Sequence, residues 1–172
     1  MHKRTVPGWD CYFLNMIDVV KSRSKDRSVQ VGCIIVGEGN SVLSMGYNGF
    51  PRGVKDKEER HERPLKYKIT EHSERNAIYN AARNGIKLLD STLYAGVWPC
   101  TDCARGIIQA GISKIVMDGR KYAEGVATWC ERWEEDFTIA LEILEAAGVR
   151  RYVRMDDGRM VPVTQNNWKE IK

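Results

Sequence analysis

The chain has 172 residues, a length that suits one domain with a single core. Apolar residues make up 42% and charged residues 29%, which is typical of a globular protein. The sequence has no apolar run of the roughly 18 residues that a membrane-spanning helix needs, and its N-terminus lacks the apolar stretch of a signal peptide. The net charge of +4 is too small to demand a nucleic-acid partner, although it would tolerate a small anionic ligand.

The first half of the chain predicts a helix, a β-hairpin and a second helix. In chain order, the predicted elements are a helix over Trp9–Arg23, strands over Val29–Val36 and Val42–Tyr47, and a helix over His72–Asn84. The stretch 50–71 is a long connection of mixed charge. It is predicted to be a mobile surface loop. The alternative is that it acts as a lid over the site or contacts another subunit.

The second half predicts alternating strands and helices. The predicted elements are strands over Thr92–Val97, Ile112–Met117 and Val149–Met155, and helices from Pro99 to near Gly111 and from about Thr128 to Ala147. Strands separated by helices favour parallel neighbours, and the initial hairpin adds one antiparallel pair. We therefore expect residues 1–172 to form a single α/β domain of three layers, in which helices cover both faces of a mixed five-stranded sheet.

Two short motifs, H-S-E at 72–74 and P-C-T-D-C at 99–103, each begin a predicted helix. A catalytic zinc ion takes three protein ligands and keeps a fourth position for water. His72, Cys100 and Cys103 supply three ligands of the right type. Cysteines three residues apart lie on one side of a helical turn, and the positive end of a helix favours thiolates. The motifs therefore predict a zinc site that lowers the pKa of a bound water.

Two other roles are open to a C-x-x-C motif, a structural zinc site and a redox pair. A structural site needs a fourth protein ligand, and the remaining candidates are poor: Cys11, Cys33 and Cys130 are isolated, and His2 and His61 lie in a predicted tail and loop. A redox pair would not require the His-x-Glu motif. Cys33 and Cys130 fall on apolar faces and are predicted to pack in the core. Five cysteines without a secretion signal indicate a reducing, cytoplasmic location.

The H-x-E…P-C-x-x-C pattern is the signature of zinc-dependent base deaminases. The mechanism expected for this chain is therefore the one known for that signature. With both motifs in place, the chain resembles the cytidine/deoxycytidylate deaminase superfamily, and within it the deoxycytidylate deaminases, from about Tyr12 to Arg154. The further stretches of resemblance are 23–26 with 30–32, 46–51, 76–78 and 109–112. The resemblance implies a cytidine-deaminase-like fold and the hydrolysis of dCMP to dUMP with release of ammonia. It also implies a catalytic Zn2+, with Glu74 as the catalytic proton shuttle. Some relatives carry a second, structural zinc around the connection 52–70, but this chain has no convincing Cys/His set there, and we predict one Zn2+ per chain.

The substrate residues that we expect are Arg23, Lys25, Asn48, Ser73 and Tyr122. The resembling proteins usually have alanine at the position of Ser73, whose backbone N–H is the expected contact to the base. Arg23, Lys25 and Arg27 could meet the phosphate, or form an ordinary solvated helix end. Asn48 can donate and accept hydrogen bonds, although G-Y-N-G on its own is an ordinary turn sequence. Tyr122 is expected to wall the pocket or to be a surface tyrosine.

The resemblance also implies regulation and assembly. Related enzymes are commonly activated by dCTP and inhibited by dTTP, each with Mg2+. The expected allosteric residues are Lys25, Arg27, Gly46, Tyr47, Asn48, Gly49 and Phe50. The expected partners are small nucleotides and further copies of the chain in a homohexamer, with neither nucleic acid nor membrane. Arg83 matches a subunit-contact arginine of some relatives, or is a solvated arginine at a helix end.

Other functions compete with this one. A deaminase of another cytosine or adenine substrate, such as a nucleoside or tRNA, would use the same chemistry. A tRNA enzyme needs a basic footprint that a charge of +4 does not provide, and nucleoside enzymes usually bind zinc through three cysteines. A riboflavin-pathway deaminase would normally add a reductase domain. A zinc-stabilised binding module without turnover is the alternative of another class, and it would not need Glu74.

Overall fold

The computed structural model describes residues 5–171, except for the side chains of residues 120–132. The helices are α1 (Trp9–Lys21), α2 (Leu65–Ile69), α3 (Ser73–Arg83), α4 (Thr101–Gln109) and α5 (Gly119–Ala146). The strands are β1 (Gly32–Val36), β2 (Val42–Tyr47), β3 (Thr92–Ala95), β4 (Lys114–Asp118), β5 (Arg150–Arg154) and β6 (Met160–Pro162). Two short 3-10 helices, η1 (Glu38–Asn40) and η2 (Glu58–His61), lie in the connections.

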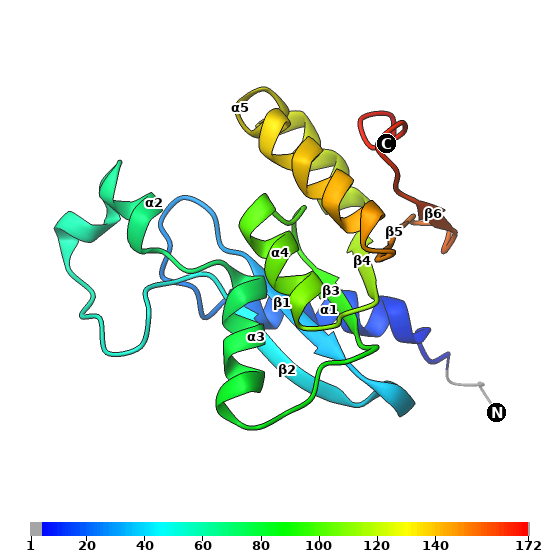
Figure 1. Cartoon of the computed structure of the whole chain (residues 1–172), viewed down its shortest axis with the longest axis horizontal. Helices are drawn as coiled ribbons and strands as arrows, with labels where there is room; N and C mark the ends of the chain where they lie inside the picture. Colours follow the sequence, from blue (N-terminus) through cyan, green and yellow to red (C-terminus); the bar gives the residue numbers. More distant parts are fainter. Residues whose placement is uncertain (1–4, 172) are drawn as a thin grey trace.

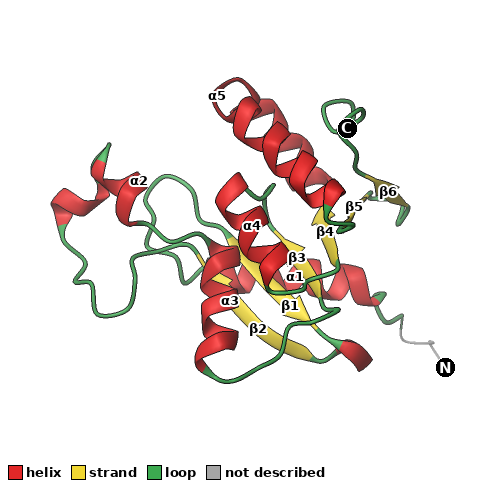
Figure 2. Ribbon diagram, viewed as in Figure 1, coloured by secondary structure: helices red, strands yellow, loops and turns green. Residues whose placement is uncertain are grey.

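All of these strands belong to one mixed sheet with the order β2-β1-β3-β4-β5-β6 (Figure 2). The pairs β3–β4 and β4–β5 are parallel, and the other pairs are antiparallel. The connection from β2 to β3 contains α3 and crosses over β1, so β1 lies between these two strands. Because β1 is antiparallel to both, β2 and β3 run in the same direction. This arrangement confirms the predicted α/β class and mixed sheet.

The predicted number of five strands is wrong, because the chain turns back after β5 and adds β6 as a sixth strand. The turn is closed by the Met155 N–H, which donates to the Arg159 carbonyl, and by the Gly158 N–H, which donates to the Met155 carbonyl. Gly158 has a φ of +87°, a conformation that glycine adopts without strain. The Asp157-Gly158 dipeptide is the sequence signal that indicates this hairpin.

Helices cover both faces of the sheet, which gives the three layers (Figure 1). Neighbouring strand residues point to opposite faces, so Ile34 packs with α1 on one face and Ile35 packs with the other helices on the opposite face. The α1 side is built from Phe13, Leu14, Ile17, Val20, Ile34, Val36, Tyr94 and Val116. The larger core on the other face includes buried residues of α3, α4 and α5. No helix in the described part of the chain is long and apolar enough to cross a membrane.

The charged connection between β2 and α3 contains more structure than a surface loop. It includes η2 and α2, neither of which is predicted from the sequence. Lys66 of α2 is buried, and its Nζ lies 2.6 Å from Asp26 Oδ1 in the loop after α1. The ion pair therefore ties this connection to a part of the chain 40 residues earlier.

Candidate active site and metal centre

Two helices begin close to each other at one end of the strands of the sheet. His72 directly precedes α3, and Cys100 directly precedes α4, which follows β3. Figure 1 shows the two helices packed against the same face of the sheet. The carboxyl ends of parallel strands are the usual place for ligands in such folds, and the crossover order brings both motifs to this end.

The three predicted metal ligands form a compact cluster. The Cys100 and Cys103 sulfurs lie 3.4 and 3.5 Å from His72 Nδ1. All three ligand atoms lie within 4.8 Å of one another. Tetrahedral zinc, with bonds of about 2.0–2.3 Å, requires donor atoms roughly 3.5 Å apart. Two thiolates and one imidazole at these separations fit a zinc ion. Among the described side chains, no fourth His, Cys, Asp or Glu joins the cluster.

The charges in the cluster also suit a cation. Hydrogen bonding from Cys103, followed by the contact with His72, lowers the pKa of Cys100 to about 4, which favours the thiolate. The same sulfur raises the pKa of His72 to about 9 and so holds a proton on the imidazole. The neighbouring Cys100 and burial raise the pKa of Cys103. A divalent cation would take the place of the proton that His72 and the sulfurs share.

Glu74 lies in the first turn of α3 and is 2% exposed. Burial raises the pKa of its carboxyl group, and the nearby His72 charge opposes this effect. Ser73 Oγ donates to Glu74 Oε2 over 2.9 Å, so the serine hydroxyl holds one carboxylate oxygen. Cys33 donates to the Ser73 carbonyl from the core, where it is buried as predicted. The carboxyl group is therefore held beside the metal ligands.

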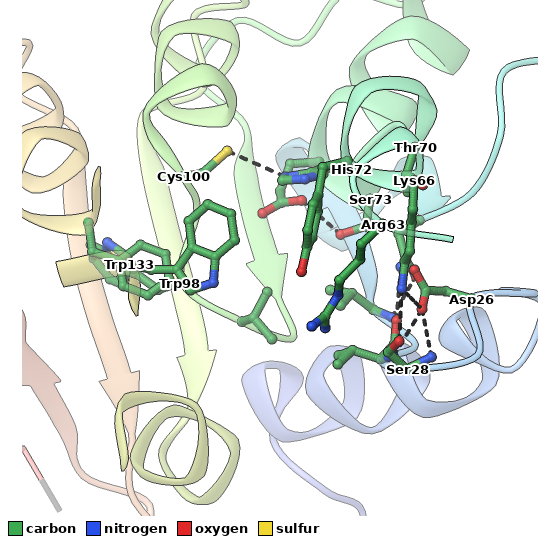
Figure 3. Close-up of a pocket in the computed structure, with 17 residues that line it drawn as sticks. Asp26, Ser28, Arg63, Lys66, Thr70, His72, Ser73, Trp98, Cys100 and Trp133 are labelled. Carbon is green, nitrogen blue, oxygen red and sulfur yellow. Dashed lines mark hydrogen bonds and ion pairs between the residues drawn. The ribbon is translucent and has the colours of Figure 1, made fainter. Parts of the chain in front are cut away.

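His72 and Cys100 of the cluster line one cavity of about 340 Å³ together with Glu74, and we call it the metal-site cavity (Figure 3). Its lining is Asp26, Ser28, Val29, Val31, Asn48, Arg63, Lys66, Tyr67, Thr70, His72, Ser73, Glu74, Val97, Trp98, Cys100, Trp133 and Phe137. Its volume is within the usual range for a small-molecule site. Asn48 is fixed in its wall, since the side-chain amide donates to the Val29 carbonyl and accepts from the Val31 N–H.

A second cavity of about 170 Å³ lies beside the first, and we call it the second cavity. Asp26, Lys66 and Thr70 line both. The second cavity is lined by Arg23, Lys25, Asp26, Tyr47, Gly49, Phe50, Val54, Asp56, His61, Lys66 and Thr70. Arg23 and Lys25, predicted as substrate residues, thus line this cavity and not the one that Glu74 lines. Lys25 pairs with Asp56 at 3.0 Å, and Arg27 pairs with Glu58.

A Cβ atom at Gly46 would collide with the Ser73 carbonyl and lie 2.5 Å from the Ala77 nitrogen, so this glycine allows β2 to approach α3. Tyr122 lies in α5, and its side chain is outside the described residues, as is that of Cys130.

Several lining residues were not predicted, chiefly Arg63, Lys66, Tyr67, Trp98, Trp133 and Phe137. Trp98 stands directly before the P-C-T-D-C motif, and this position is a signal that could have identified it. Lys66 and Tyr67 belong to a charged stretch without helical periodicity, which gave no such signal. Trp133 and Phe137 share the apolar face of α5, where core packing and pocket lining look alike in sequence.

The family model for the zinc-binding region of cytidine and deoxycytidylate deaminases matches residues 7–118, which include the cluster and Glu74. The chain belongs to the cytidine and deoxycytidylate deaminase family. An uncharacterised deaminase of Aliivibrio fischeri is 38% identical over 84% of this chain and 92% of its own length. A probable deoxycytidylate deaminase of Drosophila melanogaster is 39% identical over 82% of this chain and 70% of its own length.

A solved structure supports the family fold. The dCMP deaminase of cyanophage S-TIM5, determined in complex with dCMP and dUMP, superposes with a TM-score of 0.64 at 24% identity. The match covers 87% of this chain and 99% of the phage chain. The predicted cytidine-deaminase-like fold is therefore confirmed.

Proposed function

We propose that this deaminase converts dCMP to dUMP and releases ammonia. The main support is the His72, Cys100 and Cys103 cluster beside the buried Glu74, in a cavity of nucleotide size. Relatives that match most of the chain include the Drosophila protein, which is named a probable deoxycytidylate deaminase. We assign residues 1–172 to one catalytic domain, since a single sheet supports both parts of the core.

His72, Cys100 and Cys103 would hold one zinc ion, which when bound supplies an activated water. Glu74 takes a proton from the water and delivers it to N3 of cytosine, while the water oxygen bonds to C4. Glu74 then moves the second proton from that oxygen to the amine. The C4–N bond breaks, C4 becomes a carbonyl, and ammonia leaves. Ser73 orients Glu74 and offers its backbone N–H to the base, and Asn48 contacts the sugar or the pyrimidine edge.

Ammonia release from a panel of substrates tests this function. We expect the zinc-loaded protein to hydrolyse dCMP faster than deoxycytidine, cytidine, adenosine or a tRNA anticodon stem. Turnover of an adenine substrate in preference to dCMP would contradict the substrate assignment. A protein that binds zinc and nucleotides without releasing ammonia would be a binding module instead.

The proposal includes allosteric control, with dCTP and Mg2+ activating and dTTP and Mg2+ inhibiting. Tyr47, Gly49 and Phe50 line the second cavity together with Lys25, and Asn48 faces the metal-site cavity, so this loop contacts both. Arg27, near the same loop, could hold phosphate if Glu58 released it. The second cavity is smaller than a typical ligand site of at least about 300 Å³, so an effector would need further groups from another copy. Substrate saturation curves with each triphosphate test this point, and unchanged curves at millimolar concentration contradict it.

Assembly and location complete the proposal. We propose a homohexamer, with Arg83 at the exposed end of α3 available for a subunit contact. Light scattering of a dilute sample tests it, and a stable monomer contradicts it. We also propose a cytoplasmic location, because the four cysteines with described side chains are free thiols and two of them are assigned to zinc.

A further inference from the structure

The metal-site cavity has a buried end and an exposed end. Ser73 and Glu74 at the buried end are 1% and 2% exposed. Arg63 and Tyr67 line the same cavity and are exposed to solvent. A ligand that places its reactive ring at Glu74 would therefore extend its other end towards Arg63 and Tyr67. For a nucleotide, this other end is the phosphate.

Among the described lining residues, the basic side chains are Arg63, Lys66 and His72. His72 belongs to the metal cluster, and Lys66 Nζ lies 2.6 Å from Asp26 Oδ1, which neutralises it. The described part of the chain places no carboxylate within ion-pair distance of the Arg63 guanidinium. Arg63 is therefore the lining cation whose charge is available to an anionic ligand.

The position of Arg63 is favourable for such a contact. Its Cζ lies over the Tyr67 ring, 5.4 Å from the centroid, and Tyr67 in turn meets Trp133 edge to face at 6.3 Å. Figure 3 shows the guanidinium directed into the cavity, between Trp98 and Ser28. Stacking on an aromatic ring limits the freedom of the arginine and leaves its N–H groups to donate.

A second group is present at this end. Ser28 Oγ accepts a hydrogen bond from Lys66 Nζ over 3.0 Å, so the hydroxyl keeps its own proton for donation. Ser28 and Arg63 both line the cavity. Together they offer the paired N–H donors of a charged guanidinium and the donor of a neutral hydroxyl. This combination suits the oxygens of a phosphate monoester.

We propose that Arg63 binds the 5′-phosphate of the substrate and is the residue that selects a nucleoside monophosphate over the free nucleoside. This inference rests on the proposed function, whose phosphate contact was expected at Arg23 and Lys25. Those residues line the second cavity, and Lys25 already pairs with Asp56. Arg63 instead shares a cavity with Glu74.

Binding measurements on zinc-loaded protein test the proposal without turnover. In a Glu74→Gln background, the dissociation constants of dCMP and deoxycytidine are measured by titration calorimetry with and without Arg63→Gln. We expect Arg63→Gln to weaken dCMP binding about 10- to 100-fold, as loss of a charged hydrogen-bonded contact does, and to change deoxycytidine binding less than about twofold. Arg63→Lys should recover part of the loss, since it keeps the charge without the fork.

Lys68→Gln is the matched control, because Lys68 is an exposed cation of α2, five residues after Arg63, that lines neither of the two cavities. It should leave both constants within about twofold, like any surface charge outside the site. The proposal is overturned if Arg63→Gln weakens both ligands equally, if it weakens neither, or if only Arg23→Gln or Lys25→Gln lowers the preference for dCMP. Failure of the intact protein to bind dCMP would overturn it together with the proposed function. Tight dCMP binding without ammonia release would refute the proposed function alone.

Discussion

Glu74 is the residue on which the proposed chemistry depends most directly. Glu74→Gln preserves the size of the side chain and removes its ability to accept and release a proton. We expect kcat to fall about 10²- to 10⁴-fold, the usual contribution of proton transfer, while the zinc content stays at one per chain. Metal analysis and ammonia release on the same sample check both parts. Loss of zinc would show that Glu74 is a ligand instead.

Gly46 makes a different contribution, since its missing side chain lets β2 lie against α3. Gly46→Ala would push the new methyl group into the Ser73 carbonyl and the backbone of Ala77. We expect it to lower the free energy of unfolding by about 1–3 kcal/mol, as overpacking does. Gly49→Ala is the control, because the nearest atom to its Cβ position is 3.9 Å away. Equal stability of the two variants by urea denaturation would contradict this packing role.

The residue types and spacing of the two motifs were enough to predict His72, Cys100 and Cys103 as metal ligands. Metal ligands are constrained by chemistry that is visible in residue type and separation. Arg63 and Lys66 were beyond prediction, because their roles depend on where a connection without periodicity folds back. Asn48 was singled out for its hydrogen-bonding capacity, and the structure shows that its amide is engaged by the backbone of Val29 and Val31.

Helix α4 begins at the metal cluster, and its first turn is held from α5. The Thr101 N–H donates to Asp136 Oδ2 over 3.0 Å, and Thr101 Oγ1 donates to the Asp136 carbonyl over 2.9 Å. We expect Asp136→Ala to cost about 1 kcal/mol of stability, like the loss of a helix cap, and to weaken zinc binding because Cys100 precedes this turn. Competition with a chromogenic chelator measures the affinity. Glu135→Ala, an exposed neighbour, is the control, and equal zinc affinity in the two variants would contradict this role.

Helix α2 is held in place by the buried pair of Lys66 and Asp26, whose side chains are 10% and 6% exposed. Burial raises the pKa of Asp26, but the bond from Lys66 and the N–H groups of Val29 and Ser28 outweigh it, so the pKa is lowered. Lys66→Met leaves the carboxylate buried without its partner, and we expect a loss of about 3 kcal/mol at pH 7.

The sign of the pH dependence follows from the lowered pKa of Asp26. The stability from this group is fully present above the unfolded carboxyl pKa of about 4, and it is lost as the pH falls through the lower folded value. The Tm difference between the natural protein and Lys66→Met should therefore be constant above about pH 5 and narrow below about pH 4. Lys68→Met provides the baseline. A gap that widens in acid would contradict this assignment.

Most elements were predictable from apolar periodicity, and the failures have local causes. Val29–Val31 was predicted as the start of a strand, but the Val29 N–H binds the side chain of Asp26, and the Val29 carbonyl and Val31 N–H bind the side chain of Asn48. Helix α2 is too short for its periodicity to be recognised. Strand β6 depends on the turn at Asp157-Gly158, which follows the last predicted element.

Zinc would join α3, which lies in the connection from β2 to β3, to α4, which lies in the connection from β3 to β4. Removal of the metal should therefore lower the stability of the whole molecule. At free zinc about 1,000 times the dissociation constant, binding adds about 4 kcal/mol, which corresponds to roughly 10 °C in Tm. We expect a chelator to lower Tm by about this amount and added zinc to restore it. Cys100→Ser should abolish the zinc-dependent shift, and a full shift in that variant would place the metal elsewhere.

One wall of the metal-site cavity consists of two aromatic side chains, one behind the other. Phe137 lines the cavity, and behind it stands Trp168, edge to face at 6.4 Å and 3% exposed. The segment after β6 is thus the outer support of the pocket, although it lies farther along the chain than any motif. Laboratory evolution for altered substrate range should find productive mutations around Trp168. Changes there can move Phe137 while leaving the zinc ligands and Glu74 untouched.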